Sequence, residues 1–155
     1  MNGKVERVLI CKEAGEDLYE IEKASLVPGK GIEGDRYYFK AGTFSDALAE
    51  KGDFEVTLIE QEEIEGFNVK AGLNYIPEMF RRNIVTSGVS LNELVGKQFY
   101  IGSAKLEGIR LCEPCAYLEK LLGKEVMSLM VHKAGLRAVI KNGGIVVAGN
   151  GISKC

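Results

Sequence analysis

The sequence has no long apolar run, few cysteines and few prolines, and each of these scarcities excludes a class of protein. No stretch of about eighteen apolar residues is present, and charges near the N-terminus interrupt the apolar core that a signal peptide needs. The 4 cysteines are too few for a secreted disulfide framework, so we expect reduced thiols and a cytoplasmic location. With only 3 prolines and no repeat or linker, we expect a single domain over residues 1–155.

The chain also lacks an excess of charge of either sign. It has 20 Lys and Arg against 22 Asp and Glu, a formal net charge of −2. Such a domain has no overall field that attracts nucleic acid or an anionic membrane, so we expect neither partner. Any anion-binding site must therefore be local.

What the sequence does contain is a series of short apolar segments separated by glycines. Segments of this length and β-branched content predict strands and a mainly β fold with short helices, either a barrel or a sandwich. The expected strands are residues 5–11, 54–59, 83–86, 98–101, 104–111, 136–140 and 145–148. Helical spacing is limited to residues 46–51, 60–65, 116–122 and 125–132, and residues 37–52 are the expected mobile loop.

The glycine-dense segment 29–36 ends in Gly34, Asp35 and Arg36 and is the first candidate binding element. Glycine permits a close approach of the backbone to a ligand, and the planar guanidinium of Arg36 suits a phosphate or carboxylate. A tight turn with a structural Asp35–Arg36 ion pair explains the same residues. Both interpretations stay open.

A second candidate is the run Arg81, Arg82 and Asn83 before an apolar strand. Side chains alternate along a strand, so Arg81 and Asn83 are expected on one face and Arg82 on the other. At most one arginine then shares a pocket with Asn83. The alternative is a charged strand start exposed to water.

The third candidate is Cys112-Glu113-Pro114-Cys115, between an expected strand and an expected helix from Ala116. A cysteine at a helix N-terminus is favoured as a thiolate, which can bind a metal or carry sulfur. Half of a zinc site, a redox pair and two inert buried thiols are the alternatives, although the chain has no second C-x-x-C and no βαβ pattern. We expect Cys115 to be functional and Cys112 to support it.

Taken in order, these segments resemble the MOSC family, the C-terminal domain type of molybdenum cofactor sulfurases. The similar segments are GIEGDR at 31–36, VTLIE at 56–60, FRRNIVTSGVSLNELVGKQFYIGSAKLE at 80–107, PC at 114–115 and HKAGLRAVIKNGGIV at 132–146. The resemblance implies a strongly bent β-barrel and a molybdenum cofactor (molybdopterin), with Cys115 as the sulfur carrier or the molybdenum ligand. The cofactor-binding residues that it implies are Gly34, Asp35, Arg36, Arg81, Arg82, Asn83 and the single histidine, His132. A histidine in this setting is otherwise a cap or a core contact.

The function that the resemblance implies is a cofactor-binding or sulfur-carrier domain that works with molybdenum enzymes or cofactor-biosynthesis proteins. Pyridoxal phosphate is implied only by family association, because a pyridoxal-phosphate sulfurase domain accompanies MOSC in larger proteins. This chain is expected to lack that domain. The alternative is a small molybdenum-dependent reductase of N-hydroxylated compounds with an external electron donor, so enzymatic activity is left open. A scaffold that has lost the cofactor is a third hypothesis. Tyr37 follows the GDR element where many members carry histidine, so no role of that histidine is transferred.

Overall fold

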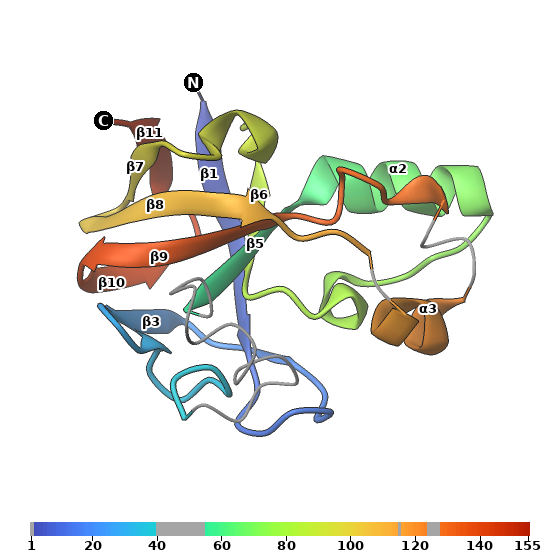
Figure 1. Cartoon of the computed structure of the whole chain (residues 1–155), viewed down its shortest axis with the longest axis horizontal. Coiled ribbons are helices and arrows are strands. Elements are labelled where there is room, and N and C mark those ends of the chain that lie inside the picture. The colour runs from blue at the N-terminus through green and yellow to red at the C-terminus, as the bar shows by residue number, and fades with distance from the viewer. Residues whose placement is uncertain (1, 40–54, 115, 124–127) are drawn as a thin grey trace.

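Strands form the framework of the computed structural model, which describes residues 2–39, 55–114, 116–123 and 128–155 (Figure 1). The strands are β1 (Gly3–Ile10), β2 (Tyr19–Glu20), β3 (Lys23–Val27), β4 (Gly31–Ile32), β5 (Val56–Glu60), β6 (Ile84–Ser87), β7 (Gln98–Ile101), β8 (Ala104–Leu111), β9 (Leu136–Asn142), β10 (Gly144–Val147) and β11 (Gly151–Lys154). The helices are α2 (Gln61–Ala71) and α3 (Ala116–Leu122), with the 3₁₀ helices η1 (Pro77–Phe80) and η2 (Leu91–Leu94).

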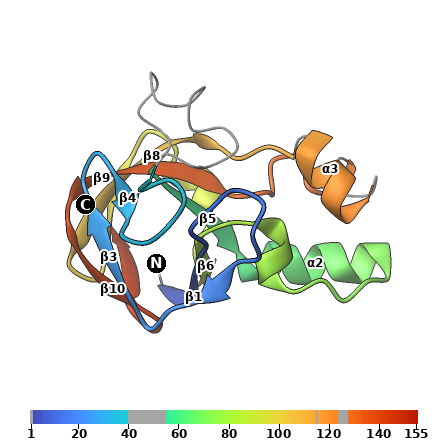
Figure 2. The same cartoon turned by 90° about the horizontal axis from the view of Figure 1, so that it is seen from below.

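Seven of these strands close into a barrel. Their order is β11-β7-β8-β9-β5-β6-β1, and β1 pairs again with β11, with Gly3 opposite Ile152. Strands β5 and β6 run parallel, whereas the other pairs of described strands are antiparallel. Strand β2 pairs with the end of β1, and β10, β3 and β4 form a small separate sheet at the side of the barrel (Figure 2). The expected mainly β barrel is therefore confirmed.

The alternation of side chains divides the apolar residues into two cores. Val8, Leu58 and Ile84 point into the barrel, whereas Ile59 and Val85 belong to a second cluster on the outer face. Helices α2 and α3 and the 3₁₀ helix η1 cover this outer cluster, which lies beside the barrel (Figure 1). The outer face of β1, β5 and β6 is thus partly protected from water. The candidate site around Arg36 and Arg81 lies at the edge of this face.

Helix α2 continues past the expected end at residue 65 because its later residues pack against the outer cluster. Ile64 and Phe67, three positions apart, are both buried, and the ring of Phe67 meets that of Phe80 edge to face at 5.5 Å. The helix ends at Gly72, whose φ of 69° is left-handed and whose N–H donates to the carbonyl of Asn68.

The strands at 98–101 and 104–111 have the expected bounds, and the other expected strands differ by a few residues. Strands β2, β3, β4 and β11 were not expected. The expected helix at 46–51 and residues 124–127 lie outside the described residues, and the expected helix at 125–132 is wrong at its end because His132 is in a turn with a φ of 61°.

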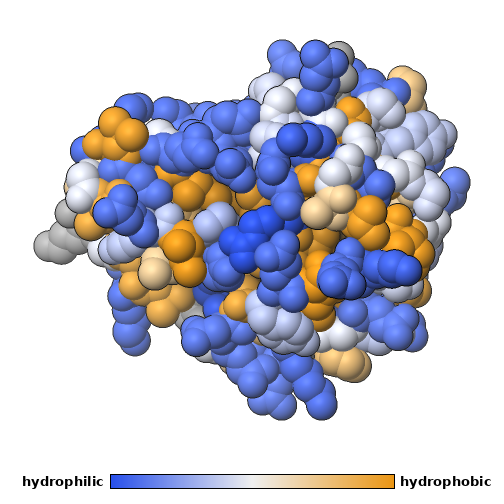
Figure 3. Space-filling model, turned by 180° about the vertical axis from the view of Figure 1, so that it is seen from behind, coloured by the Kyte–Doolittle hydropathy of each residue, from blue (hydrophilic) through white to orange (hydrophobic). Residues whose placement is uncertain are grey.

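The surface mixes hydrophilic side chains with several apolar patches, as the face opposite to the view of Figure 1 shows (Figure 3). No helix in the described ranges has the length and apolar character that a bilayer span requires.

Candidate cofactor-binding site

The turn after β4 buries an acid and a base side by side. Asp35 is fully buried and Arg36 exposes 3% of its surface. Arg36 Nη1 lies 3.1 Å from Asp35 Oδ1. The Asp35 carboxylate also accepts hydrogen bonds from the backbone N–H groups of Cys11, at 3.2 Å, and Tyr37, at 3.3 Å. Burial raises the pKa of Asp35, while Arg36 and these N–H groups act in the opposite direction. The structural ion pair that the sequence left as one interpretation is therefore present.

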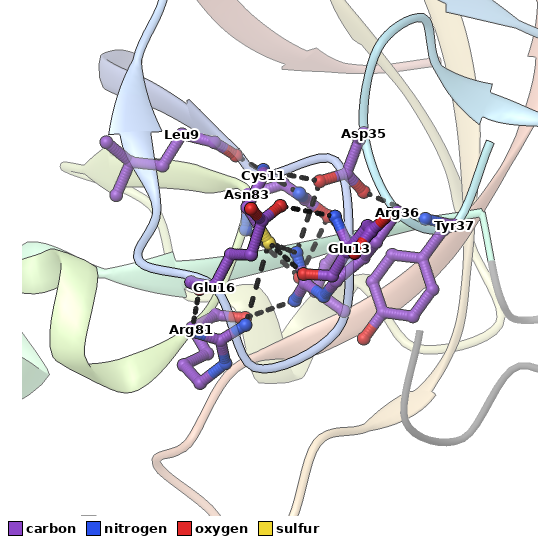
Figure 4. A network of polar contacts seen from close by, with 10 residues as sticks. Leu9, Cys11, Glu13, Glu16, Asp35, Arg36, Tyr37, Arg81 and Asn83 are labelled. Carbon is purple, nitrogen blue, oxygen red and sulfur yellow. Dashed lines mark hydrogen bonds and ion pairs between the residues drawn. The ribbon is translucent and has the colours of Figure 1, made fainter. Parts of the chain in front are cut away.

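A buried cysteine that the sequence analysis did not select lies between two arginines (Figure 4). The Sγ atom of Cys11 lies 3.7 Å from Nη1 of Arg36 and 3.6 Å from Nη2 of Arg81. The Cys11 thiol donates to the carbonyl of Glu13 at 3.2 Å. Arg36 Nη2 in turn donates to the backbone carbonyl of Arg81 at 3.0 Å. The end of β1, the turn after β4 and the end of η1 thus meet around one thiol. No local pattern marks Cys11, because the two arginines are 25 and 70 residues away.

Asn83 is fully buried and holds three strands together. Its Oδ1 atom accepts hydrogen bonds from the backbone N–H and the hydroxyl of Thr57, both at 3.1 Å. Its Nδ2 atom donates to the carbonyl of Leu9 at 3.1 Å. The side chain therefore links β1 and β5 to the start of β6. In this arrangement Asn83 positions the backbone around the Cys11 cluster.

The side chains of Arg81 and Arg82 contact different parts of the protein. Arg81 reaches Cys11, as described, whereas the Nε atom of the buried Arg82 donates to the carbonyl of Ala134 at 2.9 Å. The expectation that one arginine at most joins Asn83 is confirmed, but its reason is wrong. Strand β6 begins only at Ile84, and Arg81 has a left-handed φ of 62° as the C-cap of η1.

A row of polar residues continues from Asn83 across the outer face of the sheet. Thr57 on β5 lies opposite Arg137 on β9, and Arg137 lies opposite Arg110 on β8. Residues directly opposite each other on neighbouring strands point to the same face, so these side chains follow Asn83 in one line. Arg137 is buried and was missed by the sequence analysis. The alternation of Leu136, Arg137 and Ala138 was the available signal, since the two apolar residues face the barrel core.

The remaining candidates lie around the loop after β8. Cys115 is outside the described residues. Cys112 is buried, and its N–H donates to the carbonyl of Gly135 at 2.8 Å. The exposed His132 pairs through Nδ1 with Glu113 Oε2 at 2.6 Å. The described side-chain contact of His132 is thus with the Cys112–Cys115 loop and not with the Arg36–Arg81 cluster. Gly34 lies in the turn before that cluster with a φ of 91°, a left-handed conformation suited to glycine.

Comparison with known proteins supports this picture of the fold. The YUAD protein of Bacillus subtilis has a TM-score of 0.81 at 20% identity, and the match covers 98% of this chain and 94% of that one. YiiM of Geobacillus stearothermophilus has a TM-score of 0.73 at 11% identity, covering 99% and 75%. YiiM of Escherichia coli has a TM-score of 0.68 at 19% identity, covering 100% and 70%.

At the level of sequence, no curated protein matches the chain. The family model of the MOSC domain matches residues 34–153, which include the GDR turn, the RRN element and Cys115. The match covers most of the chain, and the structures similar to it share its barrel. The chain belongs to the MOSC family, which is associated with binding of the molybdenum cofactor.

Proposed function

We propose that this domain binds the molybdenum cofactor, with Cys115 as the thiolate ligand of molybdenum or the carrier of its sulfur. The observation that supports the proposal most strongly is the meeting of Arg36 and Arg81 at one end of β1 in a chain of this family. A thiolate is a soft ligand suited to such a metal, and guanidinium groups bind phosphate through paired hydrogen bonds. The two kinds of group together match a cofactor that carries both a metal and a phosphate.

The donors in the structure fit such a group. Arg81 is half-buried, and an arginine carries more N–H donors than its contacts with Cys11 and the Glu16 carbonyl use. Arg82 is buried and donates through Nε to the carbonyl of Ala134, away from Cys11. We therefore assign phosphate binding to Arg81. Arg36 and Asn83 use their side chains within the protein, so their proposed role is to position Arg81 and the strands beside it.

When bound, the cofactor would supply the redox and sulfur chemistry of its metal centre. The chain would contribute binding and orientation through the arginines. In this proposal the domain receives, protects or transfers the cofactor or its sulfur, and its partners are molybdenum enzymes or cofactor-biosynthesis proteins. Reduction of N-hydroxylated compounds would also need an external electron donor, and no contact among the described residues favours that use.

The test is the molybdenum content of protein purified from a host that makes the cofactor. We expect about one molybdenum per chain in the parent and none in Cys115→Ser, because a hydroxyl is a harder and less acidic ligand than a thiol. The control is Cys155→Ser, which removes an exposed thiol and should keep its metal. Cys112→Ser tests the supporting thiol and should also keep metal if it remains folded.

Mass spectrometry separates the two roles of Cys115. An additional sulfur atom on Cys115 in metal-free protein would support sulfur carriage. Parent protein without molybdenum or added sulfur in repeated preparations would contradict the proposal. A folded Cys115→Ser protein that contains as much molybdenum or added sulfur as the parent would also contradict the proposal.

A further inference from the structure

Beside the Cys11 cluster, on the other side of Arg81, the structure contains a separate pocket of about 470 Å³. The loop after β1, the 3₁₀ helix η1 with the residues on either side of it, and helix α3 line it. The lining residues that matter here are Leu18, Ile76, Met79 and Leu121, which are apolar, and Asp17 and Arg81, which are charged. Small-molecule sites in proteins have volumes of roughly 300–1,000 Å³, so the size suits such a ligand.

The apolar wall of this pocket is unusual because its large side chains remain open to water. Ile76 exposes 50% of its surface, Met79 41% and Leu121 50%, and they come from two parts of the chain, the η1 segment and α3. The wall is nevertheless held in place. Tyr75, next to Ile76, donates its hydroxyl hydrogen bond to the carbonyl of Leu122 at 2.9 Å and so connects the η1 segment with α3. A ligand would therefore meet a formed apolar surface and gain from covering it.

The charges of the pocket favour an anion at one end. Glu78 is neutralised by Arg7, whose two Nη atoms lie 2.8 and 2.6 Å from its two carboxylate oxygens. Arg81 has a carbonyl and a thiol as partners, and no carboxylate of a described residue forms an ion pair with it. Asp17 is exposed, so water screens its opposing charge. Arg81 is thus the uncompensated charge at the wall.

We propose that this pocket binds a small amphipathic anion, with an aromatic or alkyl body against Ile76, Met79 and Leu121 and an acidic group on Arg81. This site differs from the proposed cofactor site in the class of ligand and in its apolar wall, although Arg81 stands between the two. It can be examined in protein without cofactor. Failure here and failure of molybdenum binding are therefore separate results.

Two dyes that share an aromatic body test the proposal: 1-anilinonaphthalene-8-sulfonate, an anion, and N-phenyl-1-naphthylamine, which lacks the sulfonate. Fluorescence titration of folded, metal-free protein should give one saturable site for the sulfonate dye and binding about tenfold weaker for the neutral dye, because the latter forms no charge-assisted hydrogen bond. The stoichiometry matters, since loosened cores also bind the sulfonate dye without a defined site.

Variants of the wall and the charges give the decisive comparison. Arg81→Gln should weaken binding of the sulfonate dye about tenfold and leave the neutral dye unchanged. Arg81→Lys should keep most of the affinity, and Asp17→Asn should change it little, because water already screens that carboxylate. Leu121→Ser should weaken both dyes, whereas Ile145→Ser, at an equally exposed apolar residue on β10, should affect neither. Equal binding of the two dyes, or unchanged binding of the sulfonate dye to folded Arg81→Gln, would overturn the proposal.

Discussion

Replacing Asn83 with alanine would remove three hydrogen bonds from the interior at once. The Thr57 N–H and the Leu9 carbonyl would lose a partner, while the Thr57 hydroxyl still accepts from the Asn83 backbone N–H at 3.0 Å. A buried polar group without a partner costs about 1–3 kcal/mol. With two such groups we expect a loss of roughly 2–6 kcal/mol in the free energy of unfolding, a large share of the 5–15 kcal/mol typical of a domain of this size.

Urea unfolding of metal-free protein, followed by far-ultraviolet circular dichroism, measures this loss. Asn92→Ala is the matched control, because Asn92 is exposed and donates a single hydrogen bond to the His132 carbonyl. It should cost less than about 1 kcal/mol. If Asn83→Ala were as mild as Asn92→Ala, the positioning role would be refuted. A normal stability together with a loss of bound cofactor would instead identify Asn83 as a direct ligand-binding residue.

Three further changes test the fold itself. Burial raises the pKa of Glu60 to about 7, above its value in the unfolded chain, so its stabilising contribution is present at low pH and is lost as the pH rises through 7. Glu60→Gln should therefore gain stability relative to the parent between pH 5 and pH 8 in urea titrations, and a constant difference would contradict this. Gly135→Ala should prevent normal folding, because a Cβ there would overlap a backbone carbonyl of β5 and φ is 112°. Gly66→Ala, in open space within α2, should instead raise the midpoint of unfolding by the equivalent of about 0.5–1 kcal/mol.

Much of the barrel could be predicted because strands β7 and β8 show their burial in the alternation of their own residues. The strands that were missed give a weaker signal. In β3, KASLV, burial does alternate, but one of its two buried residues is the small Ala24, and β11 contains one buried residue, Ile152. These segments are strands because they form hydrogen bonds with neighbouring strands. The local sequence does not show which segments will become those neighbours.

The candidate site shows the same limit. The arginines and Asn83 could be selected from residue type and order, but the separation of Arg81 from Arg82 arises from the left-handed C-cap of η1 and not from the strand alternation that predicted it. Cys11 could not, because its environment consists of residues that only the folded chain brings to it. Its neighbour Asp35 was selected as a ligand-binding residue, yet its oxygens are occupied by Arg36 and backbone N–H groups within the protein.

The closure of the barrel also has a consequence for synthesis of the chain on the ribosome. Strand β11 pairs with β1 on one side and β7 on the other, and among the strands of the barrel it is the last to be made. Until it emerges, β1 and β7 are unpaired edges of an open sheet, which can pair with other chains. We therefore expect nascent chains that stall before residue 151 to depend on chaperones and to aggregate when these are depleted, even though most of the apolar core has already been translated.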